Sequence, residues 1–291
     1  MPELPEVETT RRAMAQVLAT RPIKKVVLRR DRLRWLIPDH LPTTLAHARV
    51  LRCERRGKYI LLFCENSSAS GWLLIHLGMS GSVCHVLPDT AIKKHDHVDF
   101  DCGDIILRYN DPRRFGAILW LNGTQAVLPT SPLLERLGVE PFSEFCHAKQ
   151  LYTASRGLKI AVKSWLLAGK AVVGVGNIYC SESLFYAKIH PSQIVGSLTL
   201  LECERLYTAI LQVLQAALEA GGSTLNDFAS GAHSLGQYQN QMAVYGRAGL
   251  PCIDCSTPIL LWLREGKAVG GRATYFCPYC QPIANAFKVI R

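Results

Sequence analysis

The chain has 291 residues, 48% of them hydrophobic, which is enough for two domains with sizeable cores and a smaller module. Its 33 Lys and Arg residues outnumber its 23 Asp and Glu residues, and the resulting formal charge of +10 favours a polyanionic partner. A role confined to a membrane surface is disfavoured, because the sequence has no basic amphipathic helix with a broad apolar face.

The start of the chain predicts neither a secretory signal nor a membrane span. The first ten residues carry three glutamates and no basic segment, and the apolar runs at 59–63 and 259–263 are too short to cross a bilayer. Seven of the eleven cysteines lack paired spacing, which is typical of buried thiols in a reducing compartment. We therefore expect a cytoplasmic protein.

A helix is expected directly after the amino end. Val7, Met14 and Leu18 recur on one helical face. Pro5 suits the first turn of a helix, and the carboxylate of Glu6 suits the positive end of the helix dipole.

Short β-rich runs follow from about residue 23 to residue 121, among them KKVVLRR, KYILLF and GWLLIHL. Their spacing predicts an antiparallel sandwich or barrel within a first domain at 1–130. A stretch rich in Pro, Ser and Thr predicts a hinge at 131–150. Helical periodicity then predicts a second domain at 151–244, whose longest helix ends at Gly221 and Gly222.

The last segment, 245–291, carries the strongest local signal. Cys252 and Cys255 form one CxxC pair, Cys277 and Cys280 form another, and 21 residues separate the two pairs. Four thiolates at this spacing can surround Zn²⁺ tetrahedrally. With no open ligand position, one such ion is structural rather than catalytic. Two strand-like runs between the pairs predict a hairpin with Arg272 at or near its tip.

The run VVGVGNIYCSESLF joins two predicted helices through Gly174, Gly176 and Asn177. It lacks the third glycine and the acidic residue of a dinucleotide-binding motif. Asn177 is a good helix N-cap, and the amides of the helix start would then face an anion. An ordinary interhelical turn is the alternative.

Three short motifs lie among the predicted strands. Lys58 follows Gly57 and, taken alone, reads as a surface lysine. Met79 and Phe115 lie in turns, Phe115 directly after two arginines, which suits a protein that wedges apolar side chains into a DNA stack. Burial of both residues is the alternative. In KHDHVDF, His95 alternates with a second histidine, but without a clear third ligand this is a poor metal site.

Together these motifs resemble the bacterial formamidopyrimidine-DNA glycosylases, which remove oxidised purines such as 8-oxoguanine. The resemblance is carried in order by PELPEVET, RRGKY, HLGMSG, KHDHVD, RYNDPRRFG, VVGVGNIY, SESLF, VYGR and the four-cysteine finger with RAT. It implies an α+β fold: an N-terminal antiparallel β-sandwich with flanking helices, a helix-two-turn-helix domain and a C-terminal zinc finger. Double-stranded DNA with oxidised bases or abasic sites would be the partner, bound in the cleft between the domains.

The resemblance gives the amino end a chemical role that the residues also support. Removal of Met1 would leave Pro2 as a secondary amine, and an α-amino group has a pKa of about 7.7–8.0 against about 10.4 for lysine. This amine can attack C1′ of a flipped nucleotide and expel the base, and the resulting iminium favours elimination of the 3′ and then the 5′ phosphate. Glu3 would donate and accept the proton for opening of the sugar ring.

The family pattern assigns roles to further positions. Lys58 and Arg272 would contact phosphates and donate protons in the two eliminations, and Asn177 would contact a third phosphate. The remaining residues fall into three groups: Met79, Arg113 and Phe115 to fill the gap left by the flipped base; His76, His95 and Arg114 to touch the DNA backbone; and Glu6, Gly236 and Tyr238 to recognise the lesion.

The sequence departs from the family pattern in three ways. Leu235 stands where the recognition loop commonly has a proline, which leaves the preferred lesion open. The tail after Cys280 is longer than expected, and a retained Met1 would turn the Pro2 amine into an unreactive amide.

Two other functions remain open from the sequence. An endonuclease VIII-like enzyme would prefer oxidised pyrimidines, although the HLGMSG and DPRRFG turns favour the purine branch. A non-catalytic zinc-finger DNA-binding protein is the other alternative, although the intact Pro2–Glu3 end argues against it. No helix has an apolar stripe that demands a partner subunit, so we expect a monomer.

Overall fold

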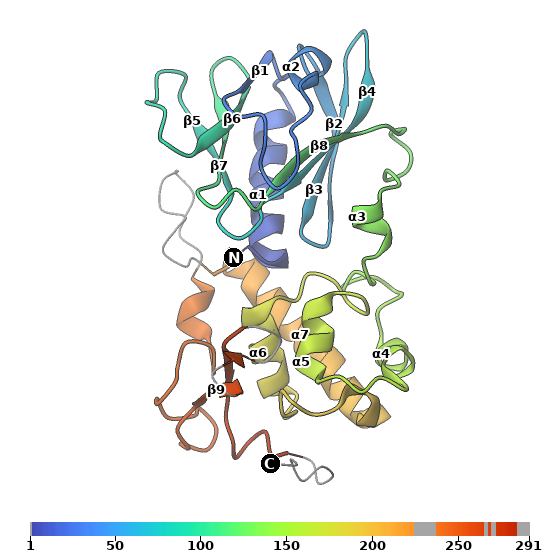
Figure 1. Ribbon diagram of the computed structural model, residues 1–291, viewed down its shortest axis with the longest axis vertical. Coiled ribbons are helices and arrows are strands. Elements are labelled where there is room, and N and C mark those ends of the chain that lie inside the picture. Colours follow the sequence, from blue (N-terminus) through green and yellow to red (C-terminus); the bar gives the residue numbers. More distant parts are fainter. Residues whose placement is uncertain (1, 224–236, 265–266, 269–271, 284–291) are drawn as a thin grey trace. The chain divides into compact units, whose positions relative to one another are not determined.

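The computed structural model describes residues 2–223, 237–264, 267–268 and 272–283, with side chains described outside 263–271. The chain forms two compact units (Figure 1). The first comprises Met1–Arg136 and Ala220–Gln237, and the second comprises Leu137–Glu219 and Tyr238–Arg291. The finer division into 1–130, 131–150, 151–244 and 245–291 stays a prediction.

Two four-stranded antiparallel sheets build the first unit, as the β-rich runs predicted (Figure 1). One sheet has the order β1 (Lys25–Leu28), β6 (Asp96–Asp101), β7 (Ile106–Asn110) and β5 (Ser82–Val86). The other has the order β2 (Arg49–Arg56), β3 (Tyr59–Glu65), β4 (Ser70–His76) and β8 (Ala117–Leu121). The short helices α2 (Leu41–Thr44) and α3 (Pro132–Glu135) also belong to this unit.

Helix α1 spans Leu4–Leu18 and contributes to the core that both sheets share. Val7, Met14 and Leu18 are buried, so the predicted apolar face is confirmed. The helix begins where expected because Pro5 lies in its first turn, where its missing N–H has no helical partner to lose. The amino end of the chain is therefore tied to a packed core rather than left to fray.

The second unit contains four helices and two short 3₁₀ turns among its described residues. The helices are α4 (Ala148–Ser155), α5 (Val162–Ala168), α6 (Asn177–Tyr186) and α7 (Leu200–Glu219), and the 3₁₀ turns are η1 (Val195–Ser197) and η2 (Tyr238–Gln241). Helix α7 ends before Gly221 and Gly222, which adopt positive φ angles of 74° and 88°, as predicted. Within these described residues, no helix is long and apolar enough to cross a membrane.

A small antiparallel sheet lies between the two CxxC pairs, with the order β10 (Lys267–Ala268), β9 (Leu260–Arg264) and β11 (Thr274–Phe276). The predicted hairpin is confirmed as the β9–β11 pair, in which Leu261 lies opposite Tyr275. Strand β10 was not predicted, because its two residues are too short to give a β pattern.

Candidate active site and metal centre

The amino end is fixed by hydrogen bonds around Glu6. Pro2 is buried and Glu3, which is 1% exposed, is the N-cap of α1. The two glutamates form a capping box, in which the Glu3 N–H donates to Glu6 Oε2 at 2.8 Å. Glu6 Oε1 accepts from the Ser223 N–H at 2.7 Å and from the Ser223 hydroxyl at 3.0 Å. Glu6 thus joins the backbone beside Pro2 to the segment that follows α7. Met1 lies outside the described residues.

Lys58 and His76 lie at neighbouring strand ends. Gly57, with φ of 57°, and Lys58 form the tight turn between β2 and β3, which explains the RRGKY spacing. Tyr59 pairs with His76 across β3 and β4, with ring centroids 4.7 Å apart. Burial lowers the pKa of His76 to about 4, and the positive charge of Lys58 adds to this shift. The Gly78 N–H donates to His76 Nδ1 at 3.1 Å, so the neutral ring carries its proton on Nε2.

The three proposed gap-filling residues come from two adjoining turns, residues 77–81 and 111–116. Arg113 and Phe115 are exposed, Phe115 to 44%, and the Arg113 guanidinium carbon lies 5.0 Å from the centre of the Phe115 ring. Met79 is partly buried. Gly78 has φ of 64°, and a Cβ on it would lie 2.5 Å from the Phe115 carbonyl carbon, so the turns meet backbone to backbone. Arg114, also exposed, adopts φ of 56°.

His95 and His97 do not form part of a metal cluster among the described residues. The His97 ring is 2% exposed, and its Nε2 lies 2.9 Å from the carbonyl oxygen of Asp111. His95 is half-buried, and its carbonyl accepts from the Asp111 N–H at 3.1 Å. Both histidines therefore support the turn that begins at Asp111.

Asn177 is not the N-cap of α6, so that prediction is wrong. Gly176, with φ of −102° and ψ of −158°, occupies the cap position, and Asn177 is the first helical residue. Its side chain instead donates from Nδ2 to the carbonyl of Ala273 at 3.1 Å, while its buried Oδ1 has no hydrogen-bond partner among the described residues. Ala273 follows Arg272 in the sequence. Asn177 and Arg272, the two residues of the second unit that are predicted to contact phosphates, are therefore connected through the backbone of Ala273.

Lys163, which the sequence analysis missed, reinforces this arrangement. It lies on α5 and is fully buried, and its Nζ donates to the Ala273 carbonyl at 2.7 Å and to Thr274 Oγ1 at 2.8 Å. A buried ammonium needs such oxygen partners. Lys163 and Asn177 therefore fix the backbone immediately after Arg272.

Tyr238 is buried rather than presented at the surface. It is 3% exposed, its ring lies 5.4 Å from that of Tyr179, and burial raises the pKa of its hydroxyl. Gly236 and Leu235 of the predicted recognition loop lie outside the described residues.

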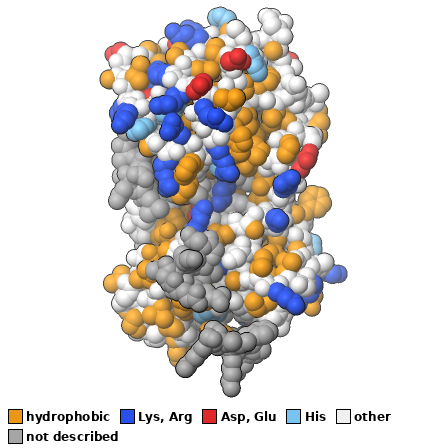
Figure 2. All heavy atoms as spheres, viewed as in Figure 1, with side chains coloured by type: hydrophobic (Ala, Val, Ile, Leu, Met, Phe, Trp, Pro, Cys, Tyr) orange, Lys and Arg blue, Asp and Glu red, His pale blue; other side chains and the backbone are white. Residues whose placement is uncertain are grey.

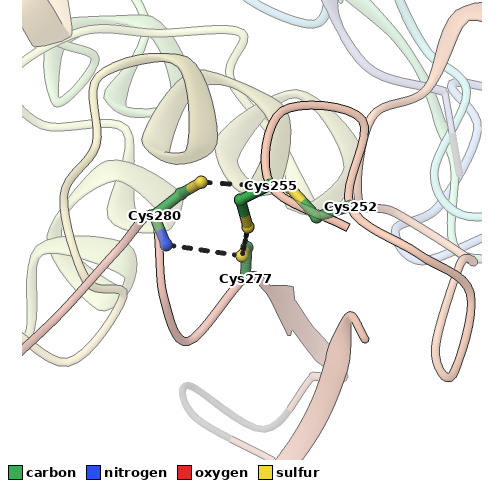
Figure 3. Close-up of side chains that lie close together, drawn as sticks. All are labelled: Cys252, Cys255, Cys277 and Cys280. Atoms are coloured by element: carbon green, nitrogen blue, oxygen red, sulfur yellow. Dashed lines mark hydrogen bonds between the residues drawn. The ribbon is translucent and has the colours of Figure 1, made fainter. Parts of the chain in front are cut away.

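The four cysteines converge as their spacing predicted (Figure 3). Their sulfur atoms all lie within 4.8 Å of one another, with 3.9 Å between Cys252 and Cys280 and 3.5 Å between Cys255 and Cys277. A tetrahedral ion with Zn–S bonds of about 2.3 Å requires sulfurs about 3.8 Å apart. The N–H of Cys280 donates to Cys277 Sγ at 3.4 Å, and such a bond favours a thiolate. The cluster can therefore hold a metal ion, and its donor set fits zinc.

Comparison with known proteins places these features in one family. A model of the formamidopyrimidine-DNA glycosylase N-terminal domain matches residues 1–118, and a model of the H2TH domain of the same glycosylase matches residues 137–229. The formamidopyrimidine-DNA glycosylase of Bordetella pertussis is 48% identical over 282 residues, which is 97% of this chain and 99% of that protein. The chain belongs to the formamidopyrimidine-DNA glycosylase family.

Other members of the family agree in sequence and in fold. The formamidopyrimidine-DNA glycosylase of Bordetella avium is 49% identical over 282 residues, with 97% of this chain and 99% of that protein covered. The MutM (Fpg) protein of Thermus thermophilus is 36% identical, with a TM-score of 0.83 over 97% of this chain and 100% of its own. A Lactococcus lactis Fpg mutant in complex with Fapy-dG DNA is 32% identical, with a TM-score of 0.86 over the same shares. The resemblance seen in the motifs is thus confirmed.

The finger of this formamidopyrimidine-DNA glycosylase family member is anchored by polar side chains that the sequence did not reveal. Glu182 on α6 is fully buried, and its carboxylate accepts the N–H groups of Ala243, Val244 and Tyr245 at 2.7, 3.0 and 2.8 Å. Gln281 is also fully buried and links the Cys277 N–H to the Ile189 carbonyl. The four-cysteine cluster and the residues that precede it are therefore bonded to α6 and to Ile189, which follows α6.

Lys and Arg side chains gather on the visible face of the first unit (Figure 2). Arg113 and Arg114 of this unit are exposed. Such a grouping is the electrostatic signature expected of a family that binds DNA.

Proposed function

We propose that this chain is a bifunctional DNA glycosylase and abasic-site lyase of base excision repair, which excises oxidised purines with Pro2 as its nucleophile. The observation that carries the proposal is the buried Pro2, held directly ahead of a capped helix by Glu3 and Glu6. It is supported by solved relatives: Lactococcus lactis Fpg proteins bound to DNA containing Fapy-dG or an abasic site, and a MutM protein bound to DNA containing carbocyclic 8-oxo-G.

The reaction begins when the Pro2 nitrogen, freed by removal of Met1, attacks C1′ of the damaged nucleotide. The glycosidic bond breaks, the base leaves with its bonding electrons, and Glu3 supplies the proton that opens the sugar ring. The resulting iminium withdraws electrons, so a proton is lost from C2′ and the 3′ phosphate departs. A second elimination expels the 5′ phosphate. Lys58 and Arg272 assist these two steps at the phosphates.

The remaining predicted residues hold the DNA. Met79, Arg113 and Phe115 fill the gap left by the flipped base, which offsets part of the lost stacking. His76, His95, Arg114 and Asn177 contact the backbone; His76 does so as a neutral Nε2–H donor. Glu6 and Gly236 contribute to lesion recognition, and Tyr238 supports it from its buried position against Tyr179.

The metal is proposed to be one structural Zn²⁺ ion bound by Cys252, Cys255, Cys277 and Cys280. Metal analysis of the purified chain should find one zinc per molecule. Chelation of the metal, or Cys252→Ser, should weaken DNA binding while the first unit keeps its circular dichroism and thermal transition. Unchanged DNA binding after complete metal removal would contradict this role.

We further propose that the protein acts as a monomer on DNA in the bacterial cytoplasm. A sedimentation experiment with and without lesion DNA tests the monomer. Co-sedimentation of a second copy on one short duplex would contradict it.

Borohydride trapping tests the proposed chemistry. Reduction of the iminium should join the wild-type chain covalently to DNA containing 8-oxoguanine, whereas Pro2→Gly or a chain that keeps Met1 should give little or no adduct. Correctly processed protein that binds lesion DNA but forms no adduct would instead indicate a non-catalytic DNA-binding protein. Preferential trapping on thymine glycol over 8-oxoguanine opposite cytosine would favour the endonuclease VIII-like alternative.

A further inference from the structure

Asp111 is a buried carboxylate to which the reaction above gives no role. It follows the last residue of β7 and is 0% exposed. Its Oδ1 accepts from the Ser80 hydroxyl at 2.7 Å. Its Oδ2 accepts from the Gly116 N–H at 2.9 Å and from the Tyr109 hydroxyl at 3.4 Å. One carboxylate therefore reaches both turns that carry the gap-filling residues.

Ser80 completes the bridge between these turns. Its hydroxyl oxygen accepts from the Arg113 N–H at 3.1 Å while its proton goes to Asp111. Ser80 is the residue after Met79, and Gly116 is the residue after Phe115. The bonds from Asp111 and Ser80 thus hold the backbone N–H groups of Arg113 and of Gly116, the residue after Phe115, and the side chain of Ser80, the residue after Met79.

The backbone of Asp111 is itself firmly placed. Its N–H donates to the His95 carbonyl at 3.1 Å, and its carbonyl accepts from His97 Nε2 at 2.9 Å and from the Arg114 N–H at 3.2 Å. In the part of the chain that the structure describes, the donors to its carboxylate are neutral: two hydroxyls and one backbone N–H. Burying a carboxylate with neutral donors is costly unless every bond is made, so loss of this group should release both turns at once.

We propose that Asp111 is a positioning residue that keeps Met79, Arg113 and Phe115 assembled as one wedge before DNA binds. This inference rests on the proposed function. Asp111 touches neither the lesion nor the reacting atoms, yet base removal from duplex DNA depends on it, because the wedge must enter the stack as the base leaves. Cleavage of an abasic site in single-stranded DNA does not depend on Asp111, since no base is extruded and no opposite strand needs support.

The test compares Asp111→Ala and Ser80→Ala with Asp99→Asn. Asp99 is a buried carboxylate on β6, the strand that pairs with β7, and it bonds Arg29 and Arg108 rather than the turns. Single-turnover removal of 8-oxoguanine from a duplex is measured beside cleavage of a preformed abasic site in a single-stranded oligonucleotide. Thermal melting gives the stability of each variant.

Asp111→Ala should lose duplex base removal by on the order of a hundredfold, the loss typical of a misplaced contact, and keep single-strand cleavage within about threefold of wild type. Ser80→Ala should lower the rate of duplex base removal relative to the rate of single-strand cleavage by a smaller factor, because the Asp111–Gly116 bond remains. Asp99→Asn should leave unchanged the ratio of the rate of duplex base removal to the rate of single-strand cleavage, even if the variant is less stable than the wild type.

Equal losses on both substrates, or no loss on either, would overturn the inference for Asp111. If Asp111→Ala does not fold, Ser80→Ala decides by the same ratio. A wild-type chain that cleaves neither substrate would instead overturn the proposed function, and this inference with it.

Discussion

Glu6 links two segments of the first unit that lie 217 residues apart in the sequence. Among the hydrogen bonds that its two carboxylate oxygens accept are one from Glu3 and two from Ser223. Gln at this position presents an NH₂ group that cannot accept, so at least one buried N–H loses its partner. We expect Glu6→Gln to cost about 1–3 kcal/mol of the free energy of unfolding and to slow borohydride trapping.

Urea denaturation and the rate of adduct formation check this prediction. Glu8→Gln is the matched control, since Glu8 lies on the same helix but pairs with Arg11 and Arg12. It should keep the wild-type trapping rate. A Glu6→Gln variant that traps at the wild-type rate would show that the link to Ser223 does not position the nucleophile.

His76 gives the stability a specific pH dependence. Burial lowers its pKa to about 4, below the ordinary value of 6.5. As the pH falls below that ordinary value, His76 becomes protonated in the unfolded chain but stays neutral in the folded chain. The contribution of His76 to stability is therefore complete above the ordinary pKa and is lost as the pH falls towards the folded one.

The variant His76→Gln should consequently lose less stability than the wild type between about pH 7 and about pH 5, as measured by urea denaturation. The exposed His40→Gln should behave as the wild type does. An identical pH dependence in the wild type and in His76→Gln would refute this assignment.

At the scale of elements, the bend at residues 243–245, before the finger, depends on helix α6. Glu182 accepts three consecutive backbone N–H groups, which a glutamine side chain cannot do. We expect Glu182→Gln to lower the free energy of unfolding of the second unit by about 1–3 kcal/mol and to weaken DNA binding, with the metal retained. Denaturation, metal content and DNA titration measure these three effects.

The exposed Glu204→Gln on α7 provides the control and should match the wild type. Loss of metal from Glu182→Gln in step with loss of DNA binding would mean that Glu182 stabilises the cluster itself rather than the placement of the finger.

Elements with a strong local signal could be predicted from the sequence. Helix α1 has its proline and apolar face, the sheets have their alternating runs, and the finger has its paired cysteines. These signals act between residues close in sequence, so they survive without knowledge of the tertiary fold. The boundary at Asn177 was missed by one residue, because Gly176 could adopt the extended cap conformation and freed Asn177 to reach Ala273.

The buried charged residues could not be predicted. Lys163 and Glu182 lie in helices, where a charged side chain usually marks the solvent face, and their partners are 110 and about 60 residues away. The position of Asp111, between a predicted strand and a turn that begins with proline, indicates only a turn. Its bond to Ser80 could not be predicted, because the two residues are 31 positions apart. Each of these contacts exists only after the fold has formed.

At the scale of the whole molecule, the formal charge of +10 predicts a strong salt dependence of DNA binding. Each lysine that neutralises a phosphate releases a counterion when DNA binds. We expect Lys58→Ala to reduce the slope of log affinity against log salt by about one on lesion-containing duplex.

Fluorescence anisotropy over a range of salt concentrations measures this slope. Lys149→Ala removes an exposed lysine with no predicted DNA contact and should leave the slope unchanged. An unaltered slope in Lys58→Ala would remove Lys58 from the phosphate contacts.

The burial of four cysteines outside the finger has a consequence for their resistance to oxidation. Oxidants such as peroxide attack the thiolate form, and burial raises the pKa of Cys53, Cys102 and Cys203 to about 11 and that of Cys64 to about 12. At neutral pH these side chains are almost wholly protonated. The same packing that fills the core thus protects the repair protein from the chemistry whose damage it removes.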